Sequence, residues 1–121
     1  MFTDRELDLM GVLWEHGPST AAQVKERLAD RLAYTTVLTV LRVLEAKGSV
    51  THTVEGKAHR FRPTVTRESA AKATIQYLTH KLFRDSPALF LAHLIDGGAN
   101  DPQTMQRMRK VLKKRLKAAT T

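Results

Sequence analysis

The chain has 121 residues, 42% of them hydrophobic and 26% charged, a composition that is globular and excludes an intrinsically disordered chain. It has no cysteine, which excludes disulfides and thiolate metal sites, and no apolar run approaches the roughly 20 residues that span a membrane. The formal net charge of +8 favours a polyanionic partner. The N-terminal residues lack the pattern of a secretion signal, so we expect a cytoplasmic protein with no stable membrane association.

The charge is unevenly distributed along the chain. Residues 1–30 carry three Lys or Arg against six Asp or Glu, a net charge of −3. Residues 31–65 carry six against two, which gives +4, and residues 66–121 carry eleven against four, which gives +7. We therefore expect the middle of the chain to meet phosphates, and we exclude the first thirty residues from that role.

Two short helices are predicted at the start of the chain. Thr3 with Glu6, and Thr20 with Gln23, are capping-box pairs that open them. The first helix has an apolar face at helical spacing, formed by Leu7, Met10, Leu13 and Trp14, and ends at Gly17-Pro18. The second helix ends near Asp30, and the side chains of Ala21, Val24 and Leu28 are predicted to face inward.

A third helix begins near Tyr34. Its buried face is predicted from the i, i+3, i+4, i+7 spacing of Val37, Val40, Leu41 and Leu44. Thr35, Thr39 and Arg42 fall on the opposite face, and hydroxyl and guanidinium groups suit contacts to bases or phosphates of DNA. Gly48 fits the position that closes a helix. The alternative interpretation is that this polar face is only solvated.

After Gly48 the side-chain pattern alternates with a period of two residues, as in a β-strand. This predicts a hairpin with strands at residues 49–54 and 58–62. Arg60 and Arg62 share one face of the second strand, and His59 and Phe61 share the other. We interpret Lys57, Arg60 and Arg62 as phosphate contacts; the alternative is that they are edge charges that prevent aggregation. Three helices followed by such a hairpin indicate a winged helix-turn-helix unit.

Three more helices are predicted after residue 66, opened by Thr66, by Ser86-Pro87 and by Asp101-Pro102. About fifty-five residues with so many apolar side chains would leave hydrophobic surface uncovered in a single copy. We infer a dimer, and the alternative is that these helices fold back on the winged unit. The expected dimerisation residues are Ile75, Leu78, Leu82, Phe90, Leu91, Leu94, Ile95, Met105, Met108 and Leu112.

The run LAYTTVLTVL at 32–41, with Leu44 and Lys47-Gly48, and the run GKAHRFRP at 56–63 resemble the penicillinase-repressor (BlaI/MecI) family of bacterial transcription regulators. The resemblance extends over nearly the whole chain. It implies a dimeric repressor that binds an inverted-repeat operator through its third helix and wing. Together, the residue patterns and the resemblance give a DNA-contacting set of Tyr34, Thr35, Thr36, Thr39, Arg42, Lys57, Arg60 and Arg62.

Two positions depart from the family pattern. The family often has Arg immediately before the leucine that is Leu44 here, whereas this chain has Val43 there and Arg42 one residue earlier. Some members are inactivated by cleavage of an Asn-Phe bond, and the aligned pair here is His93-Leu94. That pair is the candidate cleavage position, and a membrane sensor protease is the corresponding candidate partner.

The predicted fold is mainly α with a small β-hairpin. A winged-helix DNA-binding domain at 1–65 is followed by a helical dimerisation domain at 66–121. The predicted function is that of a homodimeric, sequence-specific repressor. The alternative is a winged-helix module that binds protein or nonspecific nucleic acid, in which the basic segment 107–117 would take part. No catalytic motif occurs, and we predict no cofactor or metal, although His52 and His59 could face each other across the hairpin.

Overall fold

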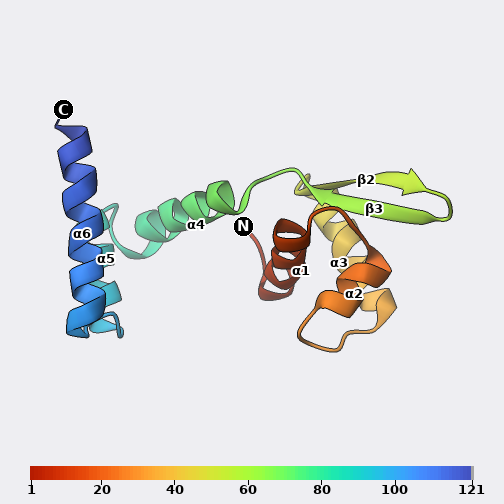
Figure 1. The fold of residues 1–121 in the computed structure, drawn as a ribbon, viewed down its shortest axis with the longest axis horizontal. Coiled ribbons are helices and arrows are strands. Elements are labelled where there is room, and N and C mark those ends of the chain that lie inside the picture. Colours follow the sequence, from red (N-terminus) through yellow and green to blue (C-terminus); the bar gives the residue numbers. More distant parts are fainter. Residues whose placement is uncertain (121) are drawn as a thin grey trace. The chain divides into compact units, whose positions relative to one another are not determined.

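The computed structural model describes residues 1–120 and has two compact units, Met1–Thr74 and the residues from Ile75 onward. The elements of Figure 1 are α1 (Asp4–His16), β1 (Ser19–Thr20), α2 (Ala21–Arg27), α3 (Tyr34–Ala46), β2 (Val50–Glu55), β3 (Ala58–Pro63), α4 (Arg67–Leu82), α5 (Pro87–Asp96) and α6 (Pro102–Ala119). The boundary between the two units, after Thr74, falls within α4. The assignment of DNA binding to 1–65 and of dimerisation to 66–121 stays a prediction.

Both predicted capping boxes at the start of the chain are confirmed. The Thr3 hydroxyl accepts the Glu6 N–H at the start of α1, and the Glu6 carboxylate accepts the Thr3 N–H. Thr20 and Gln23 make the same reciprocal pair at the start of α2. These bonds satisfy backbone donors that have no partner within the helix, so each helix begins at a fixed residue.

The core of the N-terminal unit forms where α1, α2 and α3 meet the sheet. Val37, Leu41 and Leu44 of α3 are fully buried, as their spacing predicts, and Val40 is half-buried. Other buried apolar side chains are Leu9, Met10, Val12, Leu13, Ala21, Val24, Val50 and Phe61. Each buried Leu or Val contributes roughly 2 kcal/mol, so α3 is held in one rotational setting about its axis.

The predicted inner face of α1 is wrong at Leu7, which is 45% exposed. The inner face instead follows positions 6, 9, 10 and 13, and Glu6 occupies its first position. A carboxylate is tolerated there because Lys47, at the end of α3, donates to Glu6 Oε1 at 2.8 Å. The apolar pattern alone misses this face because one of its members is charged.

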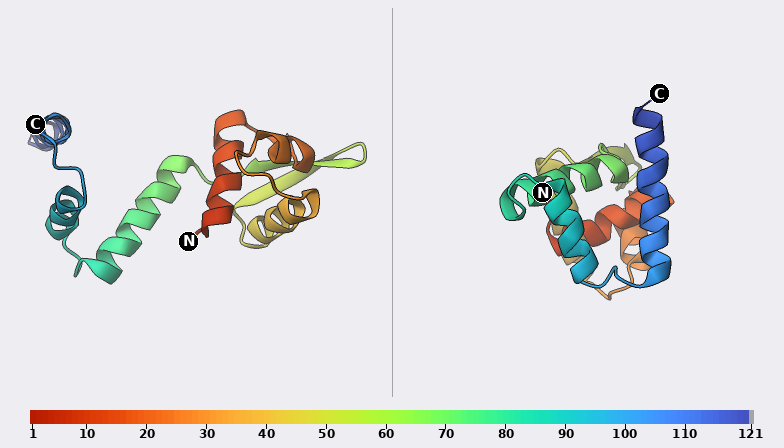
Figure 2. Two further views of the ribbon diagram at one scale, coloured as in Figure 1. Left: turned by 90° about the horizontal axis from the view of Figure 1, so that it is seen from below. Right: turned by 90° about the vertical axis from the view of Figure 1, so that its left-hand side faces the viewer.

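The sheet has three antiparallel strands in the order β1-β3-β2, whereas the sequence predicts only the two strands of the hairpin. The short β1 pairs Ser19 with Phe61, and two residues are too few to give an alternating pattern. Gly56 has a φ of 61°, a left-handed conformation that favours glycine, and forms the turn with Lys57. Figures 1 and 2 show β2 and β3 extending beyond the helices toward this turn.

Gly48 closes α3 as the sequence predicts. Its φ is 80°, the Gly48 N–H donates to the Glu45 carbonyl, and the Ser49 N–H donates to the Leu44 carbonyl. This pair of bonds is a Schellman motif. The helix therefore stops where β2 has to start.

In the C-terminal helices, Ser86 caps α5 and Asp101 caps α6, as predicted. Helix α4 ends at Leu82, because Arg84 and Asp85 have positive φ angles of 51° and 59°. Among residues 67–120, none is buried. No helix in the described part of the chain is both long and apolar enough to span a bilayer.

We expect Glu6→Gln to lower the free energy of unfolding by about 1–2 kcal/mol at neutral pH, because it removes a charged hydrogen-bond acceptor. Burial raises the pKa of the Glu6 carboxyl, but hydrogen bonds from Lys47 and Thr3 outweigh burial and hold that pKa below its ordinary value. The contribution of Glu6 is therefore present above the pKa of the unfolded chain and lost as pH falls through the lower pKa of the folded chain.

Urea unfolding of the wild type and Glu6→Gln across this acidic range measures the difference. A difference in free energy that stays constant with pH would contradict the ion pair.

Candidate nucleic-acid interface

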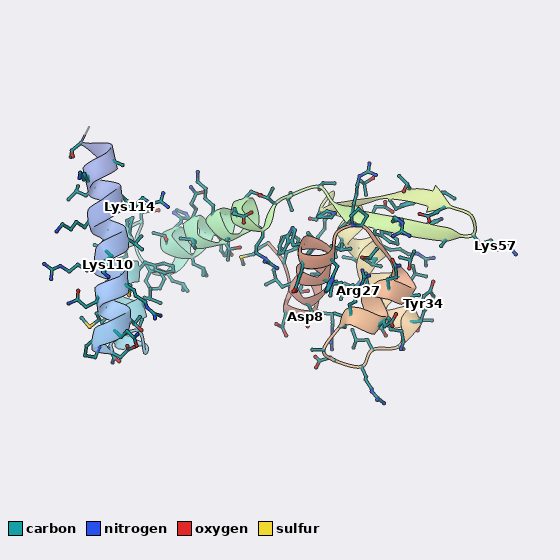
Figure 3. The ribbon with its side chains drawn as sticks, viewed as in Figure 1. Asp8, Arg27, Tyr34, Lys57, Lys110 and Lys114 are labelled. Carbon is teal, nitrogen blue, oxygen red and sulfur yellow. The ribbon has the colours of Figure 1, made fainter. Side chains whose placement is uncertain are left out.

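A groove of about 250 Å³ lies between α3 and the hairpin in the N-terminal unit. The predicted contact residues Tyr34, Arg42 and Lys57 all line it. Its other lining residues are Thr20, Ala21, Ala22, Leu38, Ala58, His59 and Phe61. Figure 3 shows Tyr34, the first residue of α3, and Lys57 at the turn of the hairpin. Hence the fold brings cations from two elements to the sides of one concave surface.

The predicted polar face of α3 is exposed. Thr35, Thr36, Thr39 and Arg42 are all exposed, and Tyr34 is 48% exposed. The Thr39 hydroxyl donates to the Thr35 carbonyl at 2.8 Å, which leaves its oxygen free to accept a hydrogen bond. Arg42 makes no ion pair with any residue in the described part of the chain. Its five donors are therefore available to a partner.

The two wing arginines are placed differently from Lys57. Arg60 Nε donates to Glu55 Oε2 at 2.6 Å, and Arg60 Nη1 donates to the Pro18 carbonyl at 3.2 Å. A hydrogen bond and the charge of Arg60 lower the pKa of the Glu55 carboxyl, and the same interaction raises the pKa of Arg60. Arg62 is exposed and lines a different pocket, beside Trp14. Of the predicted wing cations, Lys57 alone lines the groove between the hairpin and α3.

A stack of two histidines, one from β2 and one from β3, lies across the hairpin, and the residue pattern predicts no role for it in DNA contact. The His52 and His59 rings lie 4.2 Å apart between centroids and 8° from parallel. They face each other as the hairpin alternation predicts. In residues 1–120, no group of three or more His, Asp or Glu side chains is arranged to hold a metal ion.

A second concave surface, of about 590 Å³, lies within the C-terminal unit and is predominantly apolar. Five predicted dimerisation residues line it: Ile75, Phe90, Leu91, Leu94 and Leu112. The other five, which are Leu78, Leu82, Ile95, Met105 and Met108, are half-buried or exposed elsewhere in the tail. The structure therefore gathers part of the predicted apolar set on one open face.

The candidate cleavage pair lies inside α5. The His93 carbonyl accepts the Gly97 N–H at 2.9 Å, and the Leu94 carbonyl accepts the Ala99 N–H at 3.2 Å. The backbone on both sides of the His93–Leu94 bond is thus engaged in the last turn of the helix.

The chain is similar in sequence to known transcriptional regulators. A family model described as penicillinase repressor matches residues 2–114. The Transcriptional regulator BlaI of Mycobacterium tuberculosis, in strains CDC 1551 / Oshkosh and ATCC 25618 / H37Rv, is 35% identical over 109 residues. The match covers 86% of this chain and 79% of each relative.

Solved structures resemble the fold. A MarR family protein from Bacillus stearothermophilus superposes with a TM-score of 0.51 at 18% identity, covering 99% of this chain and 76% of that chain. The transcriptional regulator Tm0710 from Thermotoga maritima gives 0.53 at 19% identity, covering 98% and 75%. At such low identity these likenesses show the fold alone, which is a winged helix with further helices.

We expect Glu55→Gln to raise the affinity for any DNA duplex by about threefold at low salt, because it removes the carboxylate that neutralises Arg60. The slope of log affinity against log salt should steepen by up to about one unit. Titration of a labelled duplex at several salt concentrations measures both. Glu15→Gln, an equal change of charge at an exposed position of α1, is the control. Equal affinities and salt slopes for the two variants would contradict this role of Glu55.

Proposed function

Because this chain belongs to the penicillinase-repressor family, whose members are transcriptional regulators and not enzymes, we propose that it represses transcription as a homodimer on an inverted-repeat operator. DNA binding and regulation of transcription follow from the family. The proposal adds sequence-specific reading by α3, dimerisation through the C-terminal helices, and action in the cytoplasm, where operator DNA lies.

The observation that carries the proposal is the two-sided character of α3. One side is fixed in the core by Val37, Leu41 and Leu44, and the other presents Thr35, Thr39 and Arg42 without cover. An α-helix fits the major groove of DNA, where each base pair presents its own pattern of donors and acceptors. An exposed guanidinium on such a helix can bind O6 and N7 of a guanine.

Lys57 supports the placement of DNA against the same surface. It sits at the turn of the hairpin and lines the groove that separates the wing from α3 (Figure 3). With α3 in the major groove, the DNA backbone that bounds it would run along this groove. Lys57 then contacts phosphate, whereas Arg60 contributes less because Glu55 already neutralises it.

The exposed apolar face of the C-terminal unit supports the homodimer. Ile75 is 51% exposed, Leu94 48% and Leu112 57%, and all three line the predominantly apolar groove. A water-exposed apolar surface of this kind is typical of an interface between subunits. A twofold dimer presents two copies of α3, which matches the symmetry of an inverted repeat.

Release by a membrane sensor protease does not form part of this proposal. The aligned bond joins His93 to Leu94, not Asn to Phe. The backbone carbonyls of both residues accept hydrogen bonds at the C-terminal end of α5. A protease needs an extended backbone, so the helix would first have to open.

We expect Arg42→Ala to reduce the preference for one base pair in each half-site by about tenfold, the loss of one bidentate contact. A duplex selected from a random pool, and its single-base variants, provide the measurement. Lys57→Ala is the matched comparison, since loss of a phosphate contact weakens all sequences alike. If the relative affinities for the variants do not change in Arg42→Ala, Arg42 does not read a base.

We expect Leu112→Glu to shift the chain from dimer to monomer and to weaken operator binding at least tenfold, because it places a charge in an apolar interface. Sedimentation at micromolar concentration measures the assembly. Gln106→Glu adds the same charge at another exposed position of α6 and should leave the dimer intact. A Leu112→Glu chain that stays dimeric would contradict this interface.

A further inference from the structure

We propose that His59 is an additional DNA-contacting residue, a donor to a backbone phosphate, and that His52 and Glu45 form the platform that positions it. This inference rests on the proposed function, because it assigns one more contact to the same groove. Three observations carry it: the placement of His59, the stack beneath it, and the bond that ties the stack to α3.

His59 is exposed and lines the groove between the hairpin and α3 together with Tyr34, Arg42 and Lys57. On β3 it lies on the same face as the buried Phe61 and opposite to Arg60 and Arg62. Its side chain is therefore directed to the side of the wing that faces α3. An imidazole carries at least one N–H, and flanking cations in the groove would bring a phosphate within its reach.

The His59 ring rests on a flat support. Its partner in the stack is His52 of β2, at 4.2 Å between centroids, and the His52 ring in turn lies 5.5 Å from the core residue Phe61. An exposed side chain normally loses rotamer freedom when it binds a ligand, which costs free energy. Stacking on His52 restricts the His59 ring before DNA arrives, so less is lost on binding.

The platform is itself bound to α3. His52 Nδ1 lies 2.5 Å from Glu45 Oε2, and a carboxylate can only accept, so the ring donates its Nδ1–H. Glu45 belongs to the same helix as Arg42. The contacts from Glu45 to His52 and from His52 to His59 therefore connect α3, β2 and β3. They fix the position of His59 relative to the helix that reads the bases.

The proposed contact is tested by comparing the DNA affinity of His59→Phe with that of the wild type. The variant keeps a flat ring but has no N–H donor. We expect about fivefold weaker binding to the selected duplex and to a random duplex alike, as for loss of a phosphate contact. His16→Phe, the same change at an exposed position of α1, should bind as the wild type does. Unchanged affinity of His59→Phe overturns the contact, and a loss confined to the selected duplex overturns its assignment to phosphate.

The platform is tested at His52, with thermal unfolding of each variant as a check on folding. His52→Ala removes the ring and the bond to Glu45 and should weaken binding to both duplexes. His52→Phe keeps the ring but loses the bond to Glu45, so its affinity should lie between those of His52→Ala and the wild type. If His52→Phe binds as weakly as His52→Ala, stacking does not position His59.

Failure of the proposed function has a different signature. A wild-type chain that selects no sequence from the random pool would refute specific repression, and the His59 contact would still be judged on its affinity for the random duplex.

Discussion

The burial of one side of α3 is the constraint on which the rest of the N-terminal unit depends. Val37, Leu41 and Leu44 cannot leave the core without exposing apolar surface, so the rotation of the helix about its axis is fixed. The opposite side must then face water, and it carries Thr35, Thr39 and Arg42, whose side chains suit a nucleic acid. Packing thus determines which face of α3 is the proposed reading face. The Glu6–Lys47 pair reinforces it by tying the end of α3 to the start of α1.

The same reasoning gives a different result in the C-terminal unit. There Ser86 and Asp101 cap α5 and α6, yet none of the described residues from 67 onward is buried. Capping and helix propensity define where α5 and α6 begin, but they do not cover Phe90, Leu91 or Leu112. We therefore propose that a second copy of the chain covers these side chains, which makes assembly and twofold DNA recognition parts of one event.

Much of this fold could be predicted from the sequence, because its signals are local. Capping pairs, Gly48 and the change of period each act within a few residues. What could not be predicted depends on pairing between distant residues. Glu6 is interior only because Lys47 reaches it, and Arg60 is neutralised by Glu55 across the turn. The residues that line the groove could be predicted only in part. Strand alternation places His59 on the same face as Phe61 but cannot show which residues of α3 lie opposite.

Binding of a dimer to an inverted repeat requires two copies of α3 held at a fixed separation. The most direct test is the affinity of the wild-type chain for its selected inverted repeat as the spacing between half-sites is changed. Half a helical turn, about five base pairs, turns one half-site to the other side of the duplex. We predict that inserting it weakens binding by at least tenfold. Equal affinity for the original and the lengthened site would contradict a dimer that reads both halves.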